Sequence, residues 1–139
     1  MAFFSWKCQF ITKRFFLKMK VLYVEDNQIN RLVMERSLRK FAEITLEENG
    51  FKAIELIKEH RYDVVLIDLN LADPEIDGFG VLEAIKDNGI EAITAAVTAF
   101  TTDEWKEKCL EEGFDLYFPK PIEPDLMWAD ILRFARVNV

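Results

Sequence analysis

Short apolar segments alternate with amphipathic segments along the chain from Met19 onward. Apolar runs predict five strands, at Lys20–Val24, Ile44–Glu47, Val64–Asp68, Ala92–Val97 and Phe114–Phe118. Apolar residues at helical spacing predict five helices, at Asn27–Lys40, from Asn49-Gly50 through Ile57, and at Phe79–Asp87, Thr102–Glu112 and Pro124–Val137. Between them, Leu69–Gly80 is rich in Asp, Asn, Pro and Gly, which is typical of a loop. This alternation predicts an α/β fold with a parallel sheet, right-handed crossovers and helices on both faces.

Four of the predicted strands lead directly into a polar group that can carry chemistry. The strands and the groups that follow them are Val21–Val24 with Glu25 and Asp26, Val64–Ile67 with Asp68, Ala95–Val97 with Thr98, and Phe114–Phe118 with Lys120. Open α/β sheets form their sites at the carboxyl ends of the strands. We therefore expect these side chains to converge on one crevice.

The three acids, Glu25, Asp26 and Asp68, would repel one another in such a crevice. Two carboxylates about 4 Å apart repel by roughly 4 kcal/mol at an effective dielectric constant near 20, so the cluster needs a counter-ion or raised pKa values. Oxygen ligands without His or Cys favour Mg²⁺ or Mn²⁺ over zinc, and Mg²⁺ in proteins commonly also binds a phosphate oxygen. Lys120 offers a positive charge and Thr98 a hydroxyl for phosphate oxygens. Asp68 is then a candidate nucleophile toward phosphorus.

Each of these signals also has an ordinary structural explanation. A Glu-Asp pair after a strand is commonly a solvated loop or a helix cap, and an Asp at a strand end is commonly a turn residue. Lys-Pro is often a turn, and Thr98 could cap the next helix. The functional interpretation rests on their joint occurrence at four strand ends.

Length and composition narrow the class of protein. The chain has 139 residues, half of them hydrophobic, which suits one globular domain. Its net charge of −7 argues against nucleic-acid binding as the main function. The two cysteines, Cys8 and Cys109, lack the spacing of a disulfide framework or a zinc site, so a reducing cytoplasm is expected. The single histidine, His60, makes a His-based triad improbable.

Residues 1–18 form a basic, aromatic-rich N-terminal extension without acids. The segment is too short and too charged to span a bilayer, and it lacks the apolar core and cleavage site of a secretory signal. Three interpretations remain open: an added packing element, a basic amphipathic segment that contacts a membrane or a partner, or an upstream extension before a natural start at Met19.

Four stretches together resemble the receiver domain of two-component response regulators. They are "VLYVEDNQINRLVMERSL", "YDVVLIDLNLADPEIDGFGVLEAI", "AAVTAFT" and "LYFPKPIEP", and the resemblance covers residues 19–139. It implies a flavodoxin-like, five-stranded parallel sheet in the order 2-1-3-4-5. It also implies that Asp68 is the phospho-acceptor, and that Mg²⁺ is held by Glu25, Asp26, Asp68 and the backbone carbonyl of Asn70.

The resemblance assigns the remaining site residues as well. Thr98 matches the hydroxyl residue that follows the phosphoryl group, Lys120 the family's lysine, and Tyr117 the aromatic switch residue. The Lys120-Pro121 bond is often cis in this family. One departure is the loop Leu69–Gly78, which carries about two residues more than the family's usual loop and could tune or block the site.

The function implied by the resemblance is a phosphorylation switch. A histidine kinase or histidine phosphotransfer protein would phosphorylate Asp68, and the face formed by the fourth helix, fifth strand and fifth helix would change, either to bind a downstream effector or to form a homodimer. The chain would be no enzyme beyond its own phosphorylation and dephosphorylation, and would lie in the cytoplasm without a membrane span. No output segment follows the last helix, so we expect a stand-alone receiver or one excised from a longer protein such as a hybrid kinase.

Two other functions compete with this hypothesis. The chain could be a phosphorylation-independent binding module of receiver fold. It could also be a phosphatase or phosphotransferase of the haloacid-dehalogenase type, although such enzymes carry an acid two residues after the nucleophile, where this chain has Asn70. A calcium-binding loop is unlikely after Asp68, because Ala72 stands where a third oxygen ligand would be needed.

Overall fold

The computed structural model describes residues 18–137. Five parallel strands form one sheet in the order β2-β1-β3-β4-β5. Their bounds are β1 (Met19–Val24), β2 (Ala42–Glu47), β3 (Val64–Asp68), β4 (Ile93–Thr98) and β5 (Leu116–Pro119). The predicted fold class and strand order are confirmed. Apart from Lys18, the predicted N-terminal extension lies outside the described residues.

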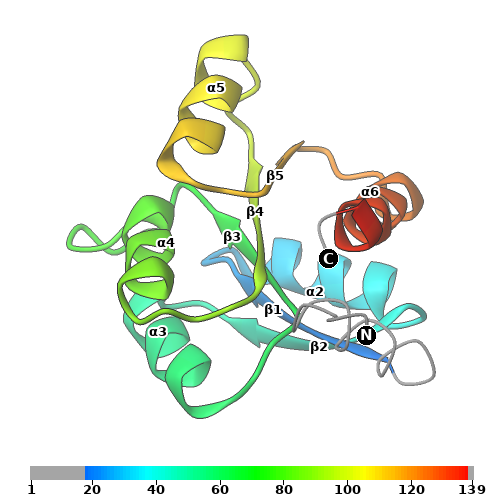
Figure 1. The fold of residues 1–139 in the computed structure, drawn as a ribbon, viewed down its shortest axis with the longest axis horizontal. Coiled ribbons are helices and arrows are strands. Elements are labelled where there is room, and N and C mark those ends of the chain that lie inside the picture. Colours follow the sequence, from blue (N-terminus) through cyan, green and yellow to red (C-terminus); the bar gives the residue numbers. More distant parts are fainter. Residues whose placement is uncertain (1–17, 138–139) are drawn as a thin grey trace, which may run out of the picture.

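Five helices cover the two faces of the sheet (Figure 1). They are α2 (Gln28–Leu38), α3 (Gly50–Glu59), α4 (Gly78–Asp87), α5 (Asp103–Glu112) and α6 (Pro124–Val137). Buried side chains of α2 and α6 pack on one face, and those of α3, α4 and α5 pack on the other. Strands β3 and β4 are buried along their whole length, as expected for central parallel strands. Among the described helices, none combines the length and the apolar content that crossing a membrane would require.

Side-chain caps explain where four of the helices begin. Asn27, Asn49, Asp77 and Thr102 each accept a hydrogen bond from a backbone N–H in the first turn of the following helix. Thr102 therefore caps α5, and Thr98 remains available to the site. The loop after β3 is shorter than the predicted Leu69–Gly80, because α4 already begins at Gly78.

The predicted start of the last strand at Phe114 was wrong by two residues. Gly113 ends α5 with a left-handed backbone (φ 112°), and the Phe114 N–H donates to the Cys109 carbonyl at 3.0 Å. Phe114 thus closes the helix end and buries its ring in the core, and β5 begins only at Leu116. An aromatic residue at a helix end and one at a strand start look alike in sequence.

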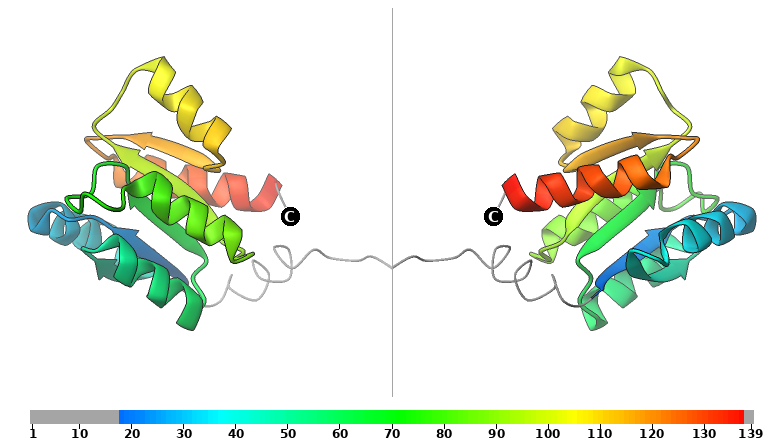
Figure 2. Two further views of the ribbon diagram at one scale, coloured as in Figure 1. Left: turned by 90° about the vertical axis from the view of Figure 1, so that its left-hand side faces the viewer. Right: turned by 90° about the vertical axis from the view of Figure 1, so that its right-hand side faces the viewer.

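Strand register brings the functional positions to one edge. Val24 pairs with Ile67, so Glu25 and Asp68 follow at the same level. Asp68 pairs with Val97, and Thr98 pairs with Pro119, the residue before Lys120. The side views in Figure 2 show the strands twisted relative to one another between the two helical layers.

The backbone of Gly78 packs closely against the backbone of Asp68 and Leu69. A Cβ at Gly78 would lie 2.4 Å from the Asp68 carbonyl oxygen and 2.7 Å from the Leu69 Cα, and neither backbone atom can move aside. We expect Gly78→Ala to lower the free energy of unfolding by about 2 kcal/mol in urea denaturation, as overpacking does. Gly80→Ala is the matched control, since the neighbours that its Cβ would meet are side-chain atoms, the nearest being Ile76 Cγ1 at 2.9 Å. Equal stability of the two variants would contradict this account.

Candidate phosphoryl-transfer site

The carboxyl edge of the sheet carries an open hollow of about 390 Å³. It contains six of the seven predicted site residues, and its lining comprises Glu25, Asp26, Asn27, Asn30, Asp68, Asn70, Thr98, Ala99, Phe100 and Lys120. The structure thus brings together six residues that the sequence pointed to separately. Tyr117, the seventh, does not line the hollow.

Lys120 links the two buried acids. Its Nζ donates to Glu25 Oε1 at 3.1 Å and to Asp68 Oδ2 at 3.2 Å. The side chains of Glu25 and Asp68 are only 1% and 7% exposed, so removal of the lysine would leave both carboxylates buried without their cation. The Lys120-Pro121 bond is cis, as the resemblance implied.

Glu25 is almost fully buried although it is an acid. Its pKa is raised to about 7, mainly by burial and then by the neighbouring Asp68, while Asn30 and Lys120 act in the opposite direction. Its Oε1 accepts from Asn30 Nδ2 at 2.5 Å and from Lys120, whereas its Oε2 is buried and has no hydrogen-bond partner among the described residues. Such an oxygen needs a cation or a proton.

These residues fit a hard divalent cation. Glu25, Asp26 and Asp68 each offer a carboxylate oxygen, and the three oxygens lie within 4.8 Å of one another. Oxygen-only donors suit Mg²⁺ or Mn²⁺. Asn70 borders the same hollow, and its backbone N–H donates to Asp68 Oδ1 at 3.1 Å. The assignment of its backbone carbonyl as a ligand stays a prediction.

Thr98 and Tyr117 are connected through the backbone of Phe100. Phe100 N–H donates to Thr98 Oγ1 at 3.0 Å, and the Tyr117 hydroxyl donates to the Phe100 carbonyl. The Thr98 hydroxyl hydrogen therefore remains available to a group bound in the hollow. The Phe100 ring stacks on Trp105 of α5, with 4.6 Å between the ring centroids.

The long loop between β3 and α4 packs its apolar side chains into the core. Leu69, Leu71 and Ile76 are buried in the core shared with α3 and α4. Asp73 accepts from the Glu75 N–H at 2.8 Å and lines a neighbouring hollow instead of the site. Of the loop residues, only Asn70 lines the hollow around Asp68, so the loop leaves that hollow open.

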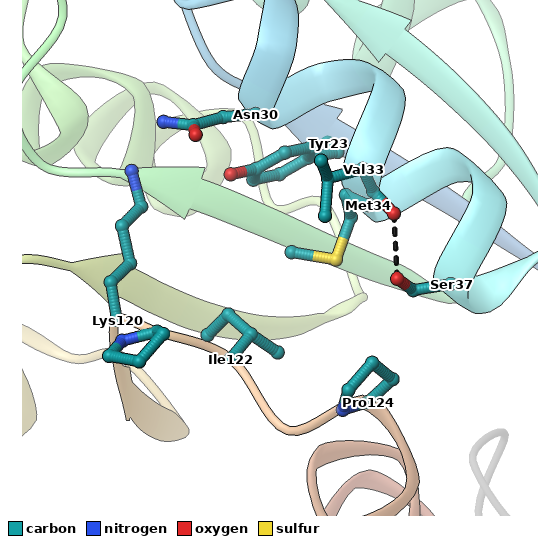
Figure 3. Close-up of a pocket in the computed structure, with 9 residues that line it drawn as sticks. Tyr23, Asn30, Val33, Met34, Ser37, Lys120, Ile122 and Pro124 are labelled. Carbon is teal, nitrogen blue, oxygen red and sulfur yellow. Dashed lines mark hydrogen bonds between the residues drawn. The ribbon is translucent and has the colours of Figure 1, made fainter.

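An apolar pocket of about 430 Å³ adjoins the site between α2 and the start of α6. Figure 3 shows Asn30 and Lys120 at one end of this pocket and Pro124 at the other. Tyr23, Val33, Met34 and Ile122 supply much of its lining. Asn30 and Lys120 also line the hollow around Asp68, so the two cavities share these side chains.

Sequence reasoning missed two residues of α2 that contact the acidic pair. Asn30 bonds the Glu25 side chain, and Arg31 Nη1 bonds the backbone carbonyls of Glu25 and Asp26 at 2.9 and 2.8 Å. Both were assigned only to a helix following the pair. Their position one turn into that helix, after an acidic pair at a strand end, is the signal that could have found them.

Comparison with known proteins agrees with this geometry. The family model described as "Response regulator receiver domain" matches residues 21–132. The chain is 31% identical to Histidine kinase 3 of Arabidopsis thaliana, with 89% of this chain and 14% of the relative covered. It is 35% identical to a cyclic di-GMP phosphodiesterase of Thermotoga maritima, with 87% and 32% covered. The chain therefore spans less than a third of the length of these relatives.

A solved structure is similar over almost its whole length. This is the receiver domain of the sensor histidine kinase PA1611 from Pseudomonas aeruginosa, whose structure has a magnesium ion coordinated in the active-site cleft. It matches with a TM-score of 0.75 and 30% identity over 85% of this chain and 98% of that chain.

The raised pKa of Glu25 predicts how stability changes with pH in the metal-free protein. The pKa rises from 4.5 to about 7 on folding, so the folded protein holds the Glu25 proton more tightly than the unfolded chain does. The stability that this proton contributes is complete below about pH 4.5 and is lost as pH rises through 7. In EDTA, the free energy of unfolding of the wild type should fall between pH 5 and pH 8. We expect the fall in Glu25→Gln to be smaller by on the order of 2 kcal/mol. Urea denaturation at both pH values measures this difference, and parallel losses in the two proteins would contradict it.

Proposed function

The chain belongs to the response regulator receiver domain family, and from this premise we propose that it accepts a phosphoryl group on Asp68 and thereby switches a protein-binding face. The observation that carries the proposal is the arrangement around Lys120. One lysine bonds two buried carboxylates, and a third carboxylate lies beside them at the open edge of the sheet.

The proposed reaction is transfer from a phosphohistidine of a histidine kinase or phosphotransfer protein. A carboxylate oxygen of Asp68 attacks the phosphorus atom, and the phosphorus–nitrogen bond breaks with its electron pair going to the imidazole. The product is an aspartyl phosphate on this chain and a free histidine on the donor. A Mg²⁺ held by Glu25, Asp26 and Asp68, with the Asn70 carbonyl, would neutralise charge on the phosphoryl oxygens.

Lys120 and Thr98 act on the same oxygens. Lys120 Nζ already contacts Asp68 Oδ2, so it lies within reach of a phosphoryl group attached to that side chain. The new group brings about −1.5 to −2 charges, which draws the ammonium group toward it. Thr98 can donate its hydroxyl hydrogen while Phe100 N–H continues to bond its oxygen.

Switching would follow from the bonds at Phe100. Movement of Thr98 toward the phosphoryl group pulls the Phe100 backbone, and this weakens the bond from the Tyr117 hydroxyl. Tyr117 lies on β5, between α5 and α6. The α5–β5–α6 face would therefore change and present a surface for an effector or for a second copy of the chain.

Apolar surface near the site suits docking of the phosphoryl donor. Ile29, Leu32 and Val33 are exposed on α2, and the apolar pocket lies between this helix and the start of α6. A donor that reaches Asp68 from the open edge would cover this side. We place the exchange in the cytoplasm and confine the chain's chemistry to its own Asp68, with no substrate turnover.

Phosphorylation of Asp68 can be tested without knowing the donor. We expect acetyl phosphate with Mg²⁺ to add one phosphoryl group to the wild type, detected by intact-protein mass spectrometry or a phosphate-affinity gel. Asp68→Asn and chelation by EDTA should each abolish the added group. Asp73→Asn, outside the hollow, is the control and should leave the labelling unchanged.

Other outcomes identify the competing functions. An unlabelled wild type that still binds its partner equally well with Asp68→Asn and without Mg²⁺ would indicate a phosphorylation-independent binding module. Sustained hydrolysis of phosphate esters would indicate a small-molecule phosphatase.

Trp105 should report the switch, because its ring stacks on Phe100. We expect beryllofluoride with Mg²⁺ to change tryptophan fluorescence in the wild type and in Trp128→Phe, whose altered ring lies in the core beside Phe41. Trp105→Phe should lose the change. Tyr117→Phe lacks the bond to Phe100 and should show part of the activated signal before beryllofluoride is added. A response that survives in Trp105→Phe would contradict this route.

A further inference from the structure

Two consecutive residues of α2 contact the acidic pair without belonging to the predicted ligand set. Asn30 bonds the Glu25 side chain at 2.5 Å, and Arg31 bonds the two backbone carbonyls of the pair. We propose that Asn30 and Arg31 form a positioning clamp, which fixes Glu25 and Asp26 in the geometry that receives the divalent cation. The inference rests on the proposed function, because it assumes that the acidic pair binds that cation.

Arg31 holds the backbone of the pair. A single nitrogen, Nη1, donates to the carbonyls of both Glu25 and Asp26, at 2.9 and 2.8 Å. Two successive carbonyls directed at one donor restrict the backbone angles of both residues, and thereby the directions in which their side chains leave the chain. The Arg31 side chain is only 16% exposed, so water competes poorly for these bonds.

A second nitrogen of the guanidinium group forms an ion pair with a residue after β2. Arg31 Nη2 lies 3.6 Å from Glu48 Oε2, just after β2. The planar group therefore spans from the loop after β1 to the loop after β2. Lysine could keep the charge at this position, but it cannot reproduce the fixed fork of donors.

Asn30 fixes the side chain of Glu25. Its amide and Lys120 both bond Oε1, so the carboxylate is oriented with Oε2 as the unpartnered oxygen. This orientation assigns one oxygen of Glu25 to the protein and leaves the other for the cation. Asn30 and Arg31 thus act through Glu25 and Asp26, and they are positioning residues rather than ligands.

Mn²⁺ binding measured by electron paramagnetic resonance tests the clamp, with Mg²⁺ as the competitor. Loss of a group that orients a metal ligand typically weakens binding 10- to 100-fold. We expect Arg31→Gln to raise the Mn²⁺ dissociation constant about 10-fold and Asn30→Ala to raise it severalfold. Arg36→Gln and Gln28→Ala are the controls on the same helix, both exposed, and should bind like the wild type.

Arg31→Lys separates geometry from charge. We expect this variant to bind Mn²⁺ nearly as weakly as Arg31→Gln, because the hold on two carbonyls is lost although the charge remains. If Arg31→Lys binds Mn²⁺ with wild-type affinity, the clamp is wrong, and the positive charge at position 31 alone accounts for the effect of Arg31→Gln. Amide hydrogen exchange at Asp26 and Asn27 without metal gives a second readout, and it should accelerate in both Arg31 variants but not in Arg36→Gln.

The failure of the clamp differs from the failure of the proposed function. If the wild type binds no Mn²⁺ that Mg²⁺ displaces, the cation site and the clamp are both wrong. If the wild type, Asn30→Ala and Arg31→Gln bind Mn²⁺ equally, with equal exchange at Asp26, only the clamp is wrong. Urea denaturation of each variant ensures that the comparison is made on folded protein.

Discussion

The crowding of like charges at the carboxyl edge of the sheet governs the rest of this structure. Three carboxylates offer oxygens within 4.8 Å of one another, and the ammonium group of Lys120 bonds two of them. The cluster of these four groups keeps a net charge of −2 when every acid is ionised. A protein that stores this repulsion when metal-free gains free energy from any cation that binds its folded state. The pKa of Glu25 is raised mainly by burial and further by Asp68, so taking up a proton is the alternative to taking up a cation.

The fold can hold this crowding because the strand ends are fixed from both sides. Two separate hydrophobic cores, one on each face, bury the strands that carry Glu25 and Asp68. Behind Asp68, Gly78 approaches the backbone too closely for any side chain. Buried Leu71 and Ile76 keep the long loop against the core, and none of the loop's acids lines the hollow around Asp68. Rigidity around the site is thus a consequence of apolar packing, whereas reactivity is a consequence of charge.

Sequence patterns predicted the sheet and the site because both depend on local periodicity and on strand ends. Asp68 follows an uninterrupted apolar run, and parallel strands align such ends whatever the details of packing. The missing parts depend on tertiary contacts. The bond of Asn30 to Glu25 and the turn of Phe114 into the core have no periodic signature, since the same residues fit a plain helix or a strand. The direction of the Leu69–Gly78 loop is decided by which of its apolar residues become buried, which loop composition alone does not specify.

Magnitudes limit what the link through Phe100 can do. The bond from the Tyr117 hydroxyl to the Phe100 carbonyl is a neutral hydrogen bond, worth a net of about 1 kcal/mol. Moving a two-state equilibrium from one extreme to the other takes about 5.5 kcal/mol of differential stabilisation. Loss of this bond therefore directs the change toward β5 but cannot drive it. The larger share has to come from the charged groups, through the pull of the phosphoryl oxygens on Lys120 and Thr98, and from the partner that binds the altered face.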